Sequence, residues 1–251
     1  MNPHQIRVQL KARKPLFGIW RLMQSNDLTE IIGSSGFHFQ IFDREHGNFD
    51  FAAVQEGIRA CELTGCSPWV RVKGIDNVEV QRALDLGAHG IVFPQLKSLE
   101  DFHSAVELMR FPPTGRRGFN PFTRAGNYGG KSEKLSDGYA LCVPIVETLS
   151  AVEQLEGILK LPGIDLIYIG AYDLSVQLSC KGEMEHPKLI GSIERIISQC
   201  RKAKKSACLM VNSAKGIKRF KKLGVSAYVH TVDTIVVRDA FLQKIQASNL
   251  K

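Results

Sequence analysis

The stretch His38–Gly47, with the sequence HFQIFDREHG, places charged side chains directly after a short apolar run. The run His38–Phe42 predicts a buried strand. A strand interior excludes ionised groups unless they are paired or coordinate a ligand. The cluster of Asp43, Glu45 and His46 is therefore either a satisfied structural cluster or an active-site corner, where the strand opens into a loop.

The same kind of run alternates with segments of helical period along the whole chain of 251 residues. With His38–Phe42, the predicted strands are Leu16–Trp20, Pro68–Val72, Gly90–Pro94, Leu141–Val146, Leu166–Gly170, Ala207–Val211 and Ala227–His230. The predicted helices are Ser25–Ser35, Phe51–Thr64, Asn77–Leu86, Leu99–Arg110, Leu149–Lys160, Pro187–Lys204, Ala214–Leu223 and Thr234–Gln246. Short strands that are each followed by a helix are typical of a parallel sheet covered by helices. Eight such units predict one α/β domain, residues 1–251, folded as a (β/α)8 or TIM barrel.

The ends of the predicted helices support this fold. Gly36, Gly65, Gly87 and Gly224 each follow a helical segment and precede a strand. A residue in the left-handed conformation often ends a helix, and glycine is the residue that adopts it most easily. We therefore expect these four glycines to be C-terminal caps.

One long connection, residues 111–138, is rich in glycine, proline, arginine and aromatic residues. A loop of this length in a compact domain is usually functional or disordered. Its arginines, Arg116, Arg117 and Arg124, suit either an acidic or phosphorylated acceptor substrate or ion pairs at a subunit interface.

The composition is that of an ordinary globular protein, with 44% hydrophobic and 23% charged residues. The N-terminal residues 1–13 are basic and polar, and no uncharged run approaches the roughly 18 apolar residues that a membrane helix needs. We therefore expect neither a signal peptide nor a membrane span, and a cytoplasmic protein. The six cysteines form no C-x-x-C pair and no zinc-type spacing, which predicts reduced thiols.

The net charge of +8 raises the question of a nucleic-acid or membrane partner. The densest basic groups, in residues 201–205 and 218–222, lie near the ends of predicted helices, where cations suit the helix dipole and stay solvated. No aromatic residues are interleaved with them for base stacking. We therefore expect small-molecule partners, and neither nucleic acid nor a membrane.

In a TIM barrel the active site lies at the C-terminal ends of the strands. Glu147 and Asp173 follow two adjacent strands with no Lys or Arg close by in sequence. They would repel each other unless they bound a cation, and two carboxylates completed by water and ligand oxygens suit Mg²⁺ or Mn²⁺ better than zinc. The alternative is that Glu147 only starts a helix and Asp173 caps the turn after it. Arg71, at another strand end, needs an anionic partner, either the Asp43/Glu45 pair or a substrate oxygen.

Together these motifs resemble, in order, those of the HpcH/HpaI family of metal-dependent pyruvate aldolases, which includes citrate lyases. The likeness runs from about Gly18 to Asp233. It is carried by Gly18-Ile19-Trp20, Asp43-Arg44-Glu45-His46-Gly47, Val70-Arg71-Val72, Ala83-Leu84-Asp85-Leu86-Gly87-Ala88, Pro112-Pro113 with Arg116-Arg117-Gly118, Val146-Glu147-Thr148 and Ile169-Gly170-Ala171-Tyr172-Asp173-Leu174-Ser175. The resemblance implies a barrel of the phosphoenolpyruvate/pyruvate-binding superfamily. It also implies reversible cleavage of a 4-hydroxy-2-oxo acid into pyruvate and an aldehyde, with Mg²⁺, Mn²⁺ or Co²⁺.

The resemblance also implies roles for single residues. Glu147 and Asp173 become the metal ligands, and Arg71 binds the keto or enolate oxygen of pyruvate. His46 becomes the acid/base, oriented by Asp43. An electropositive pair of this kind, metal and guanidinium, stabilises an enolate without a Schiff-base lysine.

By the same resemblance, Asp85 is a further catalytic residue, and other residues bind the substrate. Asp85 matches an aspartate that reaches the histidine of a neighbouring subunit, which implies a homo-oligomer, a trimer or a hexamer. Backbone N–H groups at the start of a short helix would hold the pyruvate carboxylate, where the helix dipole favours an anion. The residues implied to bind substrate are Trp20, Arg71, Gly170, Ala171, Tyr172 and Asp173.

Three positions depart from the family pattern. Ile145 stands where the family commonly has a glutamine that helps to hold pyruvate. Gly170-Ala171-Tyr172 replaces a Gly-Pro pair, and Arg44 is an unusual charge within the acidic motif. Two other functions therefore stay open: a lyase of the citrate-lyase β or malyl-CoA type, and a catalytically silent barrel that binds an anion.

Overall fold

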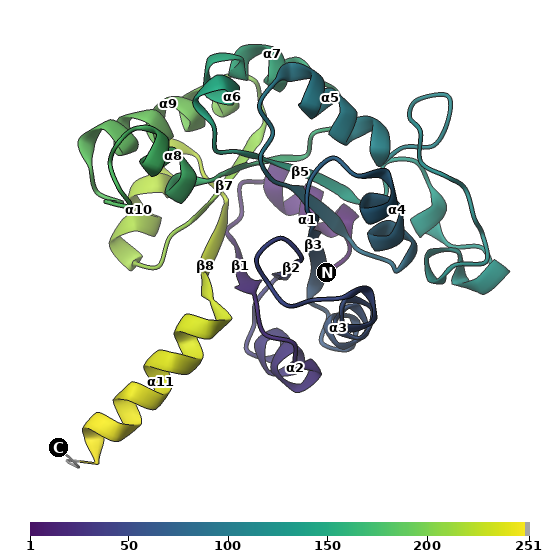
Figure 1. Cartoon of the computed structure of the whole chain (residues 1–251), viewed down its shortest axis with the longest axis horizontal. Coiled ribbons are helices and arrows are strands. Elements are labelled where there is room, and N and C mark those ends of the chain that lie inside the picture. The colour runs from purple at the N-terminus through teal and green to yellow at the C-terminus, as the bar shows by residue number, and fades with distance from the viewer. Residues whose placement is uncertain (249–251) are drawn as a thin grey trace.

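The computed structural model describes residues 1–248 and contains a closed barrel of eight parallel strands in sequence order. Most of the helices lie around this barrel (Figure 1). The strands are β1 (Leu16–Arg21), β2 (Phe39–Asp43), β3 (Ser67–Arg71), β4 (Gly90–Phe93), β5 (Leu141–Val146), β6 (Leu166–Ile169), β7 (Ser206–Met210) and β8 (Ala227–Val232). The predicted TIM barrel is confirmed, and each predicted strand overlaps an observed one.

Eleven helices and two 3₁₀ segments are formed by residues 1–248. They are α1 (Pro3–Lys11), α2 (Asn26–Ser34), α3 (Phe51–Leu63), α4 (Asn77–Asp85), α5 (Leu99–Leu108), η1 (Arg124–Gly129), η2 (Glu133–Leu135), α6 (Leu149–Glu153), α7 (Leu155–Lys160), α8 (Ala171–Gln177), α9 (Pro187–Lys202), α10 (Ala214–Leu223) and α11 (Asp233–Ala247). The predicted helix Leu149–Lys160 is divided at Gln154 into α6 and α7. The α1 helix was not predicted, although Asn2, Pro3 and Gln5 form a capping box with proline at the first turn.

The barrel interior is filled by large side chains from the strands. Phe39 and Trp69 stack with their ring centroids 4.0 Å apart. Gly18 is required beside them, because a Cβ there would lie 2.1 Å from the Phe39 ring. Ile6 and Leu10 of α1 join this interior cluster from the N-terminal side, so α1 closes the end of the barrel opposite the predicted site.

The predicted C-terminal caps are left-handed, as expected. The φ angles of Gly36, Gly65, Gly87 and Gly224 are +95°, +69°, +97° and +105°. All six cysteines are free and buried. Among residues 1–248, no helix combines the length and apolar character that a membrane crossing requires.

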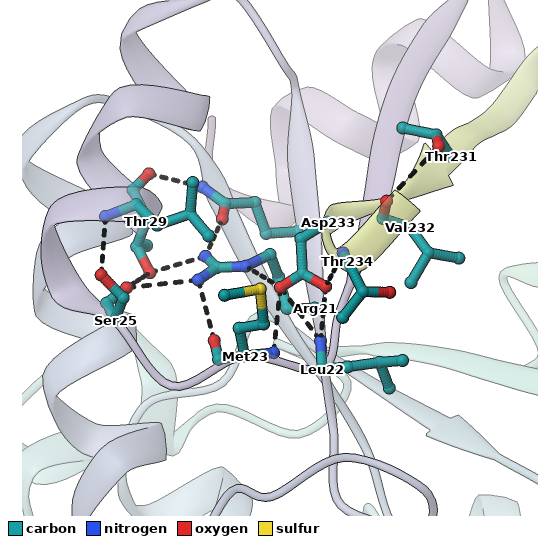
Figure 2. Close-up of polar contacts among 11 residues, drawn as sticks. Arg21, Leu22, Met23, Ser25, Thr29, Thr231, Val232, Asp233 and Thr234 are labelled. Carbon is teal, nitrogen blue, oxygen red and sulfur yellow. Dashed lines mark hydrogen bonds and ion pairs between the residues drawn. The ribbon is translucent and has the colours of Figure 1, made fainter. Parts of the chain in front are cut away.

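A fully buried ion pair links β1 to the start of α11. The Nε of Arg21 lies 3.0 Å from Oδ2 of Asp233, and both side chains are 0% exposed. Arg21 also donates to Thr29, Gln40 and the backbone of residues 23 and 25, while the Asp233 carboxylate accepts backbone N–H groups of residues 22, 23 and 234 (Figure 2). Arg21 follows Trp20 at a strand exit, but its guanidinium serves this network.

The last helix, α11, continues from β8 and projects away from the barrel (Figure 1). Its apolar side chains Ile235, Val236, Phe241, Leu242 and Ile245 are exposed. The predicted helix is therefore present, but it leaves the ring of helices that a TIM barrel normally completes.

The long connection 111–138 lies at the opposite end of the barrel from the predicted site, since it joins the end of α5 to the start of β5. Arg117 pairs with Asp85 at 3.2 Å, and Arg124 pairs with Glu62. None of the loop's arginines lines the cavity described below. A helix-to-strand loop emerges at the N-terminal face, so these arginines do not reach this chain's own cavity.

Candidate active site

A cavity of about 420 Å³ opens at the C-terminal ends of the strands. Its walls come from both ends of the sequence, since parallel strands bring their carboxyl ends to one rim. Of the predicted site residues, it is lined by Trp20, Asp43, His46, Arg71, Glu147, Gly170, Ala171, Tyr172 and Asp173. Asp85 is not among the lining residues.

Arg71, the last residue of β3, is held from three sides. Its Nε donates to Asp43 Oδ1 at 2.9 Å, and a second nitrogen also meets the Asp43 carboxylate. A third contact joins Arg71 to Glu45 at 2.9 Å. The guanidinium carbon lies 4.6 Å from the centre of the Trp20 ring. The partner expected from the sequence is therefore the Asp43/Glu45 pair, which fixes the guanidinium at the cavity wall.

Asp43 orders the backbone of the loop rather than the imidazole. Its Oδ1 accepts the backbone N–H groups of Glu45 at 2.9 Å and His46 at 3.1 Å. The His46 side chain is 69% exposed, and its Nε2 lies 4.0 Å from Glu45. The structure thus brings Asp43 and His46 together, but the contact that orients His46 runs through its main chain.

Glu147 follows β5 and is buried, with 5% of the residue exposed. Its Oε1 accepts the backbone N–H of Gln95 at 2.5 Å. Burial raises the pKa of Glu147 to about 7, and the negative charges of Asp173 and Glu45 add to this shift. A carboxylate in this environment is stabilised when a cation joins it.

Neither carboxylate is a helix cap. The N-cap of α6 is Thr148, whose side chain accepts from the N–H of residue 151. The N-cap of α8 is Gly170, and Asp173 is the third residue of that helix. Neither side chain therefore has the capping role that the structural alternative gave it, and both residues line the cavity.

Gly170 lets the two strand ends approach each other. A Cβ at this position would lie 2.5 Å from Cβ of Glu147 and 2.7 Å from its Oε2. No real Cβ makes contacts this short, so only glycine leaves the Glu147 carboxylate in place. The start of α8 is thereby pressed against the carboxylate that ends β5.

The donor set fits a hard divalent cation. In the part of the chain that the structure describes, no three His, Cys, Asp or Glu side chains gather as a complete metal cage. Among the carboxylates that line the cavity, Asp43 is paired with Arg71, and Glu147 and Asp173 follow adjacent strands and could hold a cation. Mg²⁺ is bound in this way, through one or two carboxylates with substrate and water oxygens, whereas structural zinc requires a closed set of four ligands.

Two charged residues of the recognised motifs face away from the cavity. Arg44 is bound by Glu79 at 2.8 Å and stacks on the Phe51 ring at 3.7 Å. Asp85 pairs with Arg117, and burial raises the pKa of Asp85 against the opposing effect of that arginine. The unusual charge in the Asp43–His46 motif is therefore a structural ion pair.

Gln95 and Tyr168 contact residues of the site, but the sequence assigned a role to neither. Gln95 bridges two acidic groups, since its backbone N–H reaches Glu147 and its side-chain amide donates to Glu45 Oε1 at 2.7 Å. Its position shortly after β4 places it at the rim of the barrel. Tyr168 lies inside β6, where the apolar run predicted core packing alone.

Part of the cavity lining is apolar. It is formed by Met184, Ile190, Ile193, Leu209 and Val211. Glu185, which follows Met184 in the sequence, also lines the cavity and carries a negative charge.

Comparison with known proteins agrees with this geometry. The profile of the HpcH/HpaI aldolase/citrate lyase family matches residues 16–240. A 2-dehydro-3,6-dideoxy-6-sulfogluconate aldolase from Pseudomonas putida is 33% identical over 76% of each chain. A 4-hydroxy-2-oxo-heptane-1,7-dioate aldolase from Salmonella dublin is 30% identical, over 91% of this chain and 88% of that protein.

A solved structure extends the likeness to the whole fold. An HpcH/HpaI aldolase/citrate lyase family protein from Burkholderia cenocepacia is 26% identical and superposes with a TM-score of 0.92. The alignment covers 97% of this chain and 98% of that one. The chain therefore belongs to the HpcH/HpaI aldolase/citrate lyase family and is a carbon–carbon lyase of the aldolase type.

Proposed function

We propose that the protein cleaves a 4-hydroxy-2-oxo acid reversibly into pyruvate and an aldehyde, with a divalent cation held by Glu147 and Asp173. The observation that carries this proposal is the convergence of two carboxylates and the fixed guanidinium of Arg71 on one cavity. Aldolases of this family depend on a divalent metal. When bound, Mg²⁺, Mn²⁺ or Co²⁺ would polarise the keto oxygen of the substrate as a Lewis acid.

Arg71 supplies the second positive charge for the enolate. Three of its N–H groups are engaged by Asp43 and Glu45, which leaves the others to face a substrate oxygen. Because these contacts and the Trp20 ring fix the guanidinium in advance, little reorganisation is needed when charge develops on the oxygen. This preorganised charge favours the transition state over the bound oxo acid.

His46 is the acid/base of the proposed reaction. It accepts the proton of the 4-hydroxyl group as the C3–C4 bond breaks, and returns it to the aldehyde oxygen in the synthetic direction. Its exposed imidazole can reach a substrate in the cavity mouth, while Asp43 holds its main chain. The backbone N–H groups of Ala171, Tyr172 and Asp173, at the start of α8, would receive the pyruvate carboxylate.

Assembly completes the proposed site. Asp85 would act across a subunit contact, in a trimer or in a hexamer of paired trimers. The exposed apolar side chains of α11 support association, since a free surface rarely leaves so many on one helix. Analytical ultracentrifugation should detect this oligomer, and an active monomer would contradict it.

Exchange of the C3 protons of pyruvate with solvent deuterium tests the proposal, because the reaction passes through the same enolate as aldol cleavage. We expect NMR to show exchange by the wild type with Mn²⁺ present, and loss of exchange in Glu147→Gln and Asp173→Asn. An anion-binding barrel without catalysis would bind pyruvate but exchange no protons. A lyase of the malyl-CoA type would act on CoA thioesters and would be inactive on free 4-hydroxy-2-oxo acids.

A further inference from the structure

Tyr168 places a buried hydroxyl group in the wall of the cavity. The residue is 4% exposed and lies in β6, where its register neighbour on β5 is Ile145. Both side chains belong to the barrel interior, and both line the cavity together with Arg71 and Glu147. Ile145 itself offers no polar atom to a ligand, so Tyr168 is the member of this register pair that can form a hydrogen bond.

The Tyr168 hydroxyl accepts one hydrogen bond and still has its own proton to donate. Trp20 donates its indole N–H to Tyr168 Oη at 2.9 Å, and the two rings meet edge to face with centroids 5.5 Å apart. An indole N–H only donates, so this bond uses an oxygen lone pair and leaves the phenolic proton free. No acceptor for that proton is found among the hydrogen bonds of residues 1–248.

The surroundings keep Tyr168 neutral and fixed. Burial raises its pKa, so the group stays a phenol and remains a donor. Trp20 sits between Tyr168 and Arg71, in contact with the hydroxyl on one side and the guanidinium on the other. A buried donor held in this way, shielded from water, binds an oxygen better than a solvated donor does.

We propose that the Tyr168 hydroxyl donates a hydrogen bond to an oxygen of the bound 2-oxo acid and so helps to select ligands with a 2-oxo acid head group. This inference rests on the proposed function. It assigns to Tyr168 a contact that its neighbour Ile145 cannot make, and it gives Trp20 the task of holding the hydroxyl in position.

The test compares two buried tyrosines, of which only Tyr168 lines the cavity. Tyr228 is also fully buried, yet its hydroxyl donates to the backbone oxygen of Val225 at 2.7 Å and it does not line the cavity. The dissociation constants of pyruvate and oxalate are measured by calorimetry with Mn²⁺ for the wild type, Tyr168→Phe and Tyr228→Phe. We expect Tyr168→Phe to weaken both by roughly 10- to 100-fold, and Tyr228→Phe to leave both within about twofold.

A second variant separates a lost substrate contact from a displaced Trp20. Ile145→Gln combined with Tyr168→Phe places an amide donor on the register neighbour, within reach of the same oxygen. We expect this double variant to recover at least half of the lost binding free energy. Unchanged binding in Tyr168→Phe, an equal loss in Tyr228→Phe, or no recovery in the double variant would each overturn the inference. Because binding is measured without turnover, this result is distinct from a failure of pyruvate proton exchange, which would overturn the proposed function.

Discussion

Gly170 and Glu147 are packed so closely that a single methyl group at position 170 would lie 2.7 Å from the Glu147 carboxylate. The contact arises because β5 and β6 are in register at Val146 and Ile169, which brings the residues after them to the same point of the rim. The turn that starts α8 therefore determines where the carboxylate can lie.

Gly170→Ala should accordingly displace Glu147 and weaken metal binding by roughly 10- to 100-fold, as loss of positioning around a metal ligand typically does. Titration with Mn²⁺ measures this change. Gly191→Ala, in α9, is the matched control, since a Cβ there would meet nothing within 4 Å. Equal affinities in the two variants would show that the close contact does not position the metal ligand.

The pKa of Glu147 predicts how the metal-free protein responds to pH. Below its ordinary pKa of 4.5 the group is protonated in both states, and above about 7 it is ionised in both. Because the folded state disfavours the charged form, the free energy of unfolding should fall as pH rises from about 4.5 through 7. The decrease from this group is about 3 kcal/mol. Denaturant unfolding of the wild type and Glu147→Gln at pH 5 and pH 8 isolates it, and identical pH dependence in the two would refute the assignment.

The buried pair of Arg21 and Asp233 makes a prediction about stability. Asp233→Ala would leave the guanidinium buried without its charge partner, and should destabilise the fold by about 3–5 kcal/mol. Asp239→Ala removes the partner of Arg238 from an exposed ion pair and should change stability by less than about 1 kcal/mol. Thermal and urea unfolding compare the two, and similar losses would mean that burial does not strengthen the Arg21 contact (Figure 2).

The barrel could be predicted from the sequence because each strand and helix carries its own local signal. Strand β5 and helix α10 have the predicted bounds, and the glycine caps are left-handed as expected. The direction of α11 could not be predicted, because the spacing of apolar residues indicates a helix but does not indicate which surface the helix packs against. The position of the loop arginines could be predicted from the order of the elements alone. A loop that joins a helix to the next strand lies at the N-terminal face of the barrel.

Candidate site residues that directly follow a strand could be predicted from the sequence. Residues within a strand were harder to predict. Glu147, Asp173 and Arg71 are charged residues at strand exits, which a barrel places at one rim. Tyr168 lies within a strand, where an aromatic side chain normally indicates packing, and only its free hydroxyl proton distinguishes it. The role of Asp43 toward the His46 backbone depends on loop geometry that no residue pattern encodes.

The proposed roles of Arg71 and His46 should be distinguishable by the kinetics of their alanine variants. If Arg71 stabilises the enolate, Arg71→Ala should reduce both aldol cleavage and pyruvate proton exchange by about 100- to 1,000-fold, since both pass through that species. If His46 serves the 4-hydroxyl oxygen, His46→Ala should reduce cleavage by roughly 100- to 10,000-fold and leave exchange comparatively active. Equal loss of both reactions in His46→Ala, with the metal still bound, would make His46 the base for pyruvate itself.

The most direct test of the central claim is pyruvate release from 4-hydroxy-2-oxo acids, followed before and after removal of divalent metal. The account predicts that exhaustive chelation abolishes release, and that Mg²⁺, Mn²⁺ or Co²⁺ restores it in the wild type but not in Asp173→Ala. Full turnover by the chelated enzyme, or restoration in Asp173→Ala equal to that of the wild type, would contradict metal-dependent aldol cleavage at Glu147 and Asp173.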